Sequence, residues 1–235
     1  MRTDYSVHYS AMNPSQDHES IYKRVVCEYY DAEILQIFQY VDKNLPAVDI
    51  GSGYGYMARY LLDHGFEDIH CVDNSENLLK IVTEWLPKVK ALNMDGLEFL
   101  SGKQNIFGLI TMIDLFEHFD STKAVSLAYA AYKALAPNGC LFIRTPNMAN
   151  ILGVYSKYLD VTHYVCYTEF SLKQILTEAG FNTSNIKPLS PIWPKNSKKA
   201  KHKKLNDWIH KKLFMIQDRV TPSTFDKNLL VVAYK

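Results

Sequence analysis

The sequence of 235 residues lacks three features that would assign it to particular classes of protein. It has no apolar run near the roughly 20 residues that a helix needs to cross a bilayer. Its first residues, MRTDYSVHYS, contain no apolar core of a secretory signal. Its four cysteines are scattered and form no CxxC pair, which argues against a clustered metal site. We therefore expect a cytoplasmic protein with reduced cysteines and no bound metal.

An excess of charge of one sign is also missing, because the formal net charge at pH 7 is +1. The balance is uneven along the chain, since residues 195–212 hold eight lysines and one acid, Asp207. That segment carries +7 and leaves −6 for the rest of the chain. A solvated helix docked on the body, a contact with anionic membrane lipid and a site for a phosphorylated acceptor all fit this pattern. No nucleic-acid-binding module is recognisable, which argues against nucleic acid as a partner.

Glycine is sparse, with 10 residues in the chain, but three of these glycines lie in the stretch AVDIGSGYGY at residues 47–56. The apolar residues before Gly51 indicate the end of a buried strand, and those after Gly55 indicate the start of a helix. A strand, a glycine turn and a helix together open a nucleotide-binding unit. Glycines are needed there because the backbone turns sharply and lets a ligand lie against it.

The spacing of the acid and the glycines discriminates between ligands. A dinucleotide fingerprint would place its third glycine at position 56, where the chain has Tyr56. The order here is Asp-x-Gly-x-Gly-x-Gly, with Asp49 two residues before Gly51. An acid there would repel a pyrophosphate, but it suits a ligand with a cationic amino group and no phosphate. Here the sequence resembles the class I S-adenosylmethionine-dependent methyltransferases, and the resemblance runs from about residue 45 to residue 181.

The resemblance implies that S-adenosyl-L-methionine is the cofactor and that its parts lie along one edge of a sheet. Asp73 ends the second expected strand, where an acid can accept both ribose hydroxyls, although it also fits a cap of the next helix. The resemblance places the adenine ring against Met94 and Asp95, and the methionine part near Asp114. The expected cofactor-binding residues are Asp49, Gly51, Ser52, Gly53, Asp73, Asn74, Met94, Asp95, Asp114, Leu115 and Tyr9.

The resemblance and the apolar runs together imply a Rossmann-like α/β fold. We expect a seven-stranded, mostly parallel sheet with helices on both faces and strand seven antiparallel beside strand six. The expected strands cover residues 45–50, 68–73, 89–95, 107–114, 140–144, 186–192 and 228–234. The expected parts of the chain are an N-terminal flap with helices at 1–44, the cofactor-binding core at 45–193, a basic insertion at 194–226 and a final strand at 227–235. For residues 1–20, a frayed tail is the alternative to a flap.

Two motifs on the acceptor side narrow the resemblance. Thr145-Pro146-Asn147, followed by Asp160-Val161-Thr162-His163, is similar to a subgroup that acts on sugars, glycans and related bacterial surface metabolites. The resemblance therefore implies O-methylation of a small-molecule or glycan acceptor in surface polysaccharide biosynthesis. Two alternatives stay open: methylation of a quinone-like or lipid-like hydroxyl at the membrane face, and a cofactor-binding partner subunit without activity.

Methyl transfer to a sugar hydroxyl needs alignment and, because the hydroxyl has a high pKa, a general base. His163, in a tyrosine-rich loop expected at residues 148–168, is the first candidate, and His118 is the second. Each histidine also has a structural interpretation, as the hydrogen-bond partner of a neighbouring acid. Arg144 has the alternative of an ion pair with an acid at the sheet edge. The expected acceptor-binding residues are Arg144, Asn147, Tyr164 and His8.

Overall fold

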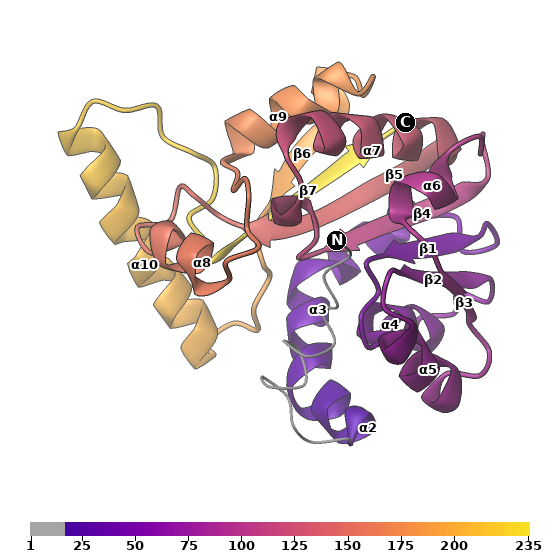
Figure 1. The fold of residues 1–235 in the computed structure, drawn as a ribbon. Helices are drawn as coiled ribbons and strands as arrows, with labels where there is room; N and C mark the ends of the chain where they lie inside the picture. The colour runs from indigo at the N-terminus through magenta and orange to yellow at the C-terminus, as the bar shows by residue number, and fades with distance from the viewer. Residues whose placement is uncertain (1–16) are drawn as a thin grey trace.

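The computed structural model describes residues 17–235 and contains a seven-stranded sheet (Figure 1). The strand order is β3-β2-β1-β4-β5-β7-β6, in which β7 runs antiparallel to β5 and β6 and the other pairs are parallel. The expected Rossmann-like α/β fold is confirmed. The strands are β1 (Ala47–Ile50), β2 (Ile69–Asp73), β3 (Lys90–Asn93), β4 (Phe107–Ile113), β5 (Leu135–Pro146), β6 (Ile186–Leu189) and β7 (Asn228–Tyr234).

Helices cover both faces of the sheet, as Figure 1 shows. The longer ones are α3 (Cys27–Glu33), α4 (Tyr56–Asp63), α5 (Glu76–Trp85), α7 (Ser121–Ala134), α8 (Gly153–Leu159), α9 (Glu169–Glu178) and α10 (Lys198–Ile216). The short turns are α2 (His18–Ile21), η1 (Tyr22–Val26), η2 (Leu35–Tyr40), α6 (Gly96–Leu100), η3 (Phe116–His118) and η4 (Thr183–Asn185). Buried side chains of α3, α4 and α5 pack on one face, and those of α6, α7 and α9 pack on the other.

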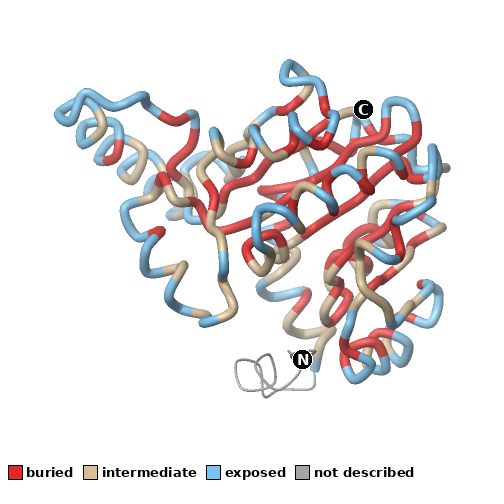
Figure 2. Tube along the Cα trace, turned by 45° about the horizontal axis from the view of Figure 1, so that its top comes forward, coloured by how far each residue is buried: buried red, intermediate tan, exposed pale blue. Residues whose placement is uncertain are grey.

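The central strands are buried on both faces, which explains their continuous apolar sequence. In β4, Leu109 packs with the core beneath α4 and α5, whereas Ile110 and Met112 pack with the core beneath α7 and α9. Figure 2 shows these strands as the buried centre of the molecule. A rigid sheet of this kind holds its carboxyl edge in place, and the candidate site lies along that edge.

Strand β5 begins at Leu135, five residues before the expected start at Cys140. The extra residues form a turn that pairs with Phe107 before a register shift restores the regular ladder. Gly139 is required in this turn, because a Cβ there would lie 2.7 Å from the carbonyl oxygen of Phe107. The Pro-Asn-Gly sequence therefore bends within the strand instead of preceding it.

The loop expected at residues 148–168 contains the helix α8, and the basic segment contains α10. The two helices lie side by side at one end of the molecule (Figure 1), where Ile151 N donates a hydrogen bond to His210 Nε2 over 2.8 Å. His210 is the buried residue of α10, and the other residues of this helix are exposed or half-buried (Figure 2). Within residues 17–235, no helix combines the length and apolarity needed to span a bilayer.

Candidate functional site

A cavity of about 790 Å³ opens at the carboxyl ends of β1, β2 and β4, beside the end of β3. Ten of the residues that the sequence singles out line it together: Gly51, Gly53, Asp73, Asn74, Met94, Asp95, Asp114, Leu115, His118 and Tyr164. Ligands of open α/β sheets bind at this edge, because the loops that follow the parallel strands meet there. The fold therefore gathers most of the expected cofactor residues around one space.

The glycine turn forms the floor of the cavity. Gly51, Gly53 and Gly55 all have positive φ angles, of 72°, 51° and 75°. A Cβ on Gly51 would also lie 2.8 Å from Leu115 Cδ1, so this position has neither the conformation nor the room for a side chain. The turn therefore brings bare backbone to the cavity.

Asp73 lies at the end of β2 and points into the turn. Its Oδ2 accepts a hydrogen bond from Gly53 N over 2.9 Å, and its Oδ1 accepts one from Ser75 N over 2.8 Å. Burial raises the pKa of Asp73, although the backbone N–H groups of Ser75 and Gly53 oppose the rise. Each carboxylate oxygen has capacity for a second donor, so the group can hold two adjacent hydroxyls.

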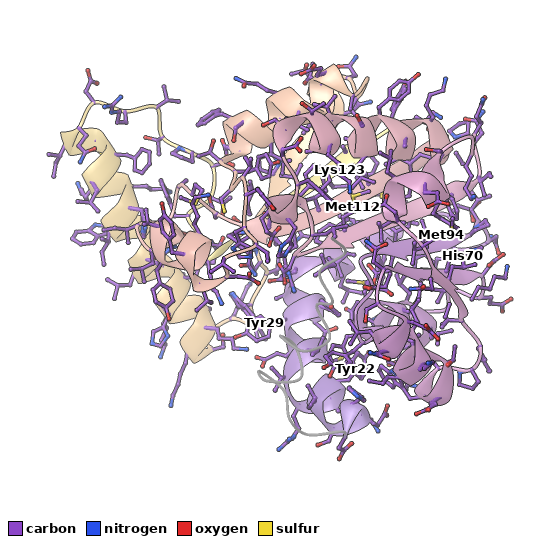
Figure 3. All side chains as sticks on the ribbon, in the orientation of Figure 1. Tyr22, Tyr29, His70, Met94, Met112 and Lys123 are labelled. Atoms are coloured by element: carbon purple, nitrogen blue, oxygen red, sulfur yellow. The ribbon has the colours of Figure 1, made fainter. Side chains whose placement is uncertain are left out.

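Met94 and Asp95 follow β3 and both line the cavity, and Figure 3 labels the side chain of Met94. Asp95 Oδ1 accepts hydrogen bonds from the backbone N–H of Leu97 and Glu98, and its Oδ2 accepts one from Lys123 Nζ over 3.2 Å. Burial opposes ionisation of Asp95, but the hydrogen bonds from Lys123 and Leu97 outweigh it and lower its pKa. Asp95 therefore lines the cavity as a charged group whose position is fixed by α6 and α7.

Asp49 and Ser52 are expected at the cofactor, but neither lines the cavity. Asp49 pairs in register with Thr111 of β4, and its Oδ1 accepts a hydrogen bond from Thr111 Oγ1 over 2.7 Å. Burial raises the pKa of Asp49 to about 7, and the hydrogen bond from Thr111 only partly opposes it. The alternation of side chains along β1 places this buried carboxylate on one face of the sheet, outside the cavity wall.

The side of the cavity at which the sequence predicts the acceptor is formed by η3 and by the loop after α8, and of its two histidines only His118 lines the cavity. Two backbone hydrogen bonds to Glu117 O, from Tyr164 N and Val165 N, hold the loop against η3. The ring centroids of His118 and His163 then lie 4.9 Å apart, and His163 Nε2 lies 4.0 Å from Glu117 Oε1. The two histidines expected to act as general bases are therefore neighbours, although 45 residues separate them in the sequence.

Hydrogen bonds orient both rings. The hydroxyl of Thr162 donates to Asp160 Oδ1 over 2.6 Å, so its oxygen accepts from His118 Nδ1 over 2.9 Å. His163 Nδ1 donates to the carbonyl oxygen of Ser156 over 3.1 Å. Burial, reinforced by the neighbouring His163, lowers the pKa of His118. His118 is therefore neutral at pH 7, with its lone pair on Nε2.

Arg144 is expected to hold the acceptor, but the structure places it in a buried ion-pair network outside the cavity wall. Its Nη1 donates to Glu33 Oε2 over 3.0 Å, and its Nε donates to Asp114 Oδ1 over 3.1 Å. The two carboxylates raise its pKa well above the ordinary value, despite the opposing effect of burial. The ion pair at the sheet edge, which was the alternative interpretation, is the arrangement observed.

Asn147 also differs from the expected acceptor contact, because it is fully buried and does not line the cavity. Its Nδ2 donates to the carbonyl oxygens of Thr224 and Asp226, and its Oδ1 accepts from Ala149 N. These bonds connect the end of β5 to the segment before β7. His8 and Tyr9 fall outside the described residues.

Several residues of the cavity wall are not singled out by the sequence, among them Glu76, Asn77, Phe119, Asp120 and Lys123. Asp120 caps α7 by accepting a hydrogen bond from Lys123 N over 2.9 Å. The Asp-Ser-Thr-Lys sequence signals such a cap, but it does not reveal that Lys123 turns back toward Asp95. That contact depends on how α7 packs against α6.

Comparison with known proteins assigns the family. A family model described as a methyltransferase domain matches residues 22–185, which is most of the chain. The chain belongs to this methyltransferase family. Its cofactor is accordingly S-adenosylmethionine. The glycine turn and the carboxylate oxygens of Asp73 fit an adenosyl group, since bare backbone lies beside a carboxylate that can accept hydrogen bonds from two hydroxyls.

Similar solved structures share the fold at low sequence identity. A SAM-dependent methyltransferase from Archaeoglobus fulgidus aligns over 99% of this chain and 100% of its own, with a TM-score of 0.68 and 20% identity. Phosphoethanolamine N-methyltransferase 2 from Haemonchus contortus, solved with phosphomonomethylethanolamine and S-adenosylhomocysteine, aligns over 86% of this chain and 51% of its own, with a TM-score of 0.60 and 18% identity.

Among curated proteins, the phosphoethanolamine N-methyltransferase of Plasmodium falciparum is 25% identical over 158 residues, or 65% of this chain. The chain spans 59% of the length of that relative. The relatives thus include enzymes that methylate nitrogen, which the sequence-based expectation of O-methylation does not anticipate.

Proposed function

We propose that this protein transfers a methyl group from S-adenosylmethionine to a hydroxyl oxygen of a sugar-type or glycan-type acceptor, as in the synthesis of surface polysaccharide. The observation that carries the proposal is the pair of imidazoles at the acceptor side, with neutral His118 in the cavity wall. A neutral imidazole within reach of a hydroxyl can accept its proton as the oxygen attacks. A hydroxyl needs such help, because its pKa is far above 7.

When bound, S-adenosylmethionine supplies the methyl group and a thioether leaving group. The acceptor oxygen forms a bond to the methyl carbon, the carbon–sulfur bond breaks, and its electron pair remains on sulfur. The chain's own part is to align the two reactants and to take the hydroxyl proton. Thr162, held by Asp160, keeps the proton of His118 on Nδ1 and so leaves Nε2 as its basic atom.

The charge of the cavity favours an uncharged acceptor over a phosphorylated one. Within the described residues, one lysine lines the cavity, Lys123, and its ammonium group is paired with Asp95. The carboxylates in the wall are those of Asp73, Glu76, Asp95, Asp114 and Asp120. A phosphate would meet a negative field there, whereas a sugar hydroxyl would not.

A competition assay tests the proposal. The full chain is incubated with S-adenosylmethionine carrying a labelled methyl group, in the presence of a panel of glycosides and of phosphoethanolamine at equal concentration. We expect label on glycoside oxygen and none on phosphoethanolamine. Labelled phosphoethanolamine would overturn the proposal in favour of N-methylation. Intact cofactor binding without transfer to any acceptor would favour a partner subunit that has no activity.

Substitution of the histidines tests their role in accepting the hydroxyl proton. His118→Ala should lower kcat by about 10²–10⁴, the usual contribution of a general base. His163→Ala, which removes the imidazole beside His118, should lower kcat by a smaller factor, and both variants should keep the Kd for S-adenosylhomocysteine within about twofold. His202→Gln, an exposed histidine of α10, is the control and should change neither quantity. Unchanged turnover in His163→Ala would remove His163 from the mechanism.

A lipid-linked acceptor at the membrane face is a second candidate, supported by the exposed surface of α8 and α10. The exposed apolar side chains of this α8–α10 surface are Ile151, Val154, Tyr155, Tyr158, Leu205, Trp208 and Ile216. Lysines of residues 195–212 lie among them along α10, and aromatic residues with basic neighbours suit an anionic bilayer surface. The loop that follows α8 carries Tyr164 to the cavity and His163 to His118 in its wall, so an acceptor held in lipid would lie close by.

Flotation with vesicles tests this candidate. The chain should float with vesicles that contain phosphatidylglycerol and should not float with pure phosphatidylcholine. Trp208→Ser combined with Tyr158→Ser should lower the floated fraction severalfold. Tyr129→Ser, which removes an exposed tyrosine of α7, should leave it unchanged. Equal flotation of all variants, or none with either vesicle, would exclude a membrane contact through this surface.

A further inference from the structure

Glu117, His118 and His163 form a cluster whose chemistry goes beyond a general base. One donor atom from each side chain lies within 4.8 Å of the donor atoms of the other two. Glu117 and His118 come from η3 after β4, and His163 comes from the loop after α8. Two imidazoles and one carboxylate are a common donor set for divalent first-row metals.

The hydrogen bonds around the cluster are those that a metal site needs. A histidine that binds metal through one nitrogen almost always donates its other N–H to a carbonyl or a similar acceptor. His163 Nδ1 does so with Ser156 O, and His118 Nδ1 does so with Thr162. Both rings are therefore set in the tautomer that carries its lone pair on Nε2.

A hydrogen bond also fixes the carboxylate of Glu117. Glu117 is buried, and its Oε2 accepts a hydrogen bond from Thr145 Oγ1 over 2.9 Å, while Oε1 faces His163. Across residues 17–235, no lysine or arginine forms an ion pair with Glu117. A buried carboxylate is costly, and a cation bound between Glu117 Oε1 and His163 Nε2 would offset that cost.

We propose that Glu117, His118 and His163 bind one divalent transition-metal ion at the acceptor side of the cavity. Zinc–nitrogen bonds of about 2.1 Å in a tetrahedral site place the donor atoms about 3.4 Å apart, so the side chains need to close by roughly an ångström. Since His118 lines the cavity, the remaining coordination position faces the acceptor. The sequence leads to the opposite expectation, because its cysteines are scattered and it shows no obvious cluster of metal ligands.

The inference deepens the proposed function and rests on it only for its catalytic consequence. A hydroxyl bound to the metal would have a lowered pKa and would release its proton to water. The resulting alkoxide would attack the methyl carbon, and the carbon–sulfur electron pair would remain on sulfur. In that arrangement the imidazoles act as ligands, and the metal takes over the activation of the hydroxyl.

Titration calorimetry of the full chain, after treatment with a chelator, tests binding without any acceptor. Zn²⁺ is the probe, and Co²⁺ added in parallel reports coordination through its visible absorption. We expect one equivalent of Zn²⁺ per chain, and at least about a 100-fold weaker Kd in Glu117→Gln and in His163→Ala. Thr162→Val, which removes the hydroxyl that orients His118, should weaken binding by about 10–100-fold.

The control is His202→Gln, which removes an exposed histidine and should leave the Zn²⁺ affinity unchanged. Circular dichroism and S-adenosylhomocysteine binding verify that each variant is folded. Zn²⁺ affinity that is equal in Glu117→Gln and in the unmodified chain would overturn the metal site. So would a loss of binding in His202→Gln alone, because the metal would then lie on α10.

Measurement of methyl transfer, together with Zn²⁺ binding, distinguishes failure of the metal site from failure of the proposed function. If methyl transfer to a glycoside persists unchanged in the chelator and no Zn²⁺ binds, the metal site is overturned and the proposed function stands. If one Zn²⁺ binds through these residues but no hydroxyl acceptor is methylated, the proposed function fails and the metal site stands.

Discussion

The cofactor wall and the acceptor wall of the cavity meet at one sheet edge, but they are built from different kinds of contact. The cofactor wall, formed by the glycine turn, Asp73 and Asp95, is held largely by backbone N–H groups bonded to carboxylates. The acceptor wall, formed by Glu117, His118 and the loop after α8, is held by side-chain and backbone bonds between residues that are far apart in sequence. The first wall depends on turn geometry, and the second depends on packing.

The difference matters because the two kinds of contact respond differently to substitution. Every residue except proline has a backbone N–H, so the cofactor wall depends on a few positions where the chain must turn. The acceptor wall loses a contact whenever one side chain of a pair is changed. Four predictions, from the largest expected effect to the smallest, test this contrast.

Removing the buried charge of Arg144, behind the cavity, should have the largest effect. Arg144 binds both Glu33 and Asp114, and Arg144→Met would leave two carboxylates without their cation. Loss of one partner from a buried ion pair costs about 3–5 kcal/mol. Urea denaturation should show a decrease of this size in the free energy of unfolding. The control Lys23→Met, at an exposed ion pair, should change it by less than about 1 kcal/mol. Equal effects of the two substitutions would contradict the prediction.

Blocking the glycine turn should act on the cofactor alone. Gly51→Val introduces a Cβ against Leu115 at a φ of 72°, and we expect the Kd for S-adenosylhomocysteine to rise by about 100-fold, or about 2.7 kcal/mol. Gly102→Val is the matched control, because Gly102 has a φ of 79° but open space around it. Calorimetry should show unchanged cofactor binding in the control. Similar losses in both variants would mean that backbone strain, and not the close approach, determines binding.

The buried acid of the glycine motif should control the pH dependence of stability. The pKa of Asp49 is about 7 in the folded chain, chiefly because of burial, and about 3.9 in the unfolded chain. Between those values the folded state retains a proton that the unfolded state releases, so the free energy of unfolding falls as pH rises from about 4 to 7.

Asp49→Asn removes this ionisation. Its free energy of unfolding should fall less steeply over that window and exceed that of the unmodified chain at pH 7.5 by about 1–3 kcal/mol. Urea denaturation at a series of pH values measures both quantities. Parallel curves for the two proteins would show that Asp49 ionises without cost in the folded state.

Substitution of Asp73, whose carboxylate we expect to bind the ribose hydroxyls, should have the smallest effect of the four. It tests whether this residue serves the cofactor wall alone. Asp73→Asn retains one oxygen that can accept from the turn but loses the charge and the second acceptor oxygen. We expect the Kd for S-adenosylhomocysteine to rise by about tenfold, close to 1.4 kcal/mol, with no change in the KM of the acceptor. Calorimetry and steady-state kinetics measure the two quantities. An effect on the KM of the acceptor alone would mean that Asp73 contacts the acceptor and not the cofactor.

Much of the fold follows from local sequence. Strand β7 has the bounds that the sequence predicts, because its apolar run is a local signal. Strand β5 starts earlier than predicted, because its turn pairs with β4 across the sheet. The helix α8 was not predicted, and its largely exposed surface gives it no amphipathic pattern to detect.

By itself the sequence determined the order of the elements, the methyltransferase family and the glycine turn, since each depends on spacing within a short stretch. Only the tertiary structure decided that Asp49 faces Thr111, that Arg144 is held by Glu33 and Asp114, and that His163 reaches Glu117 and His118. Those contacts join residues on different strands and loops. Their geometry is set by how the helices and loops pack on the sheet, and no local pattern records it.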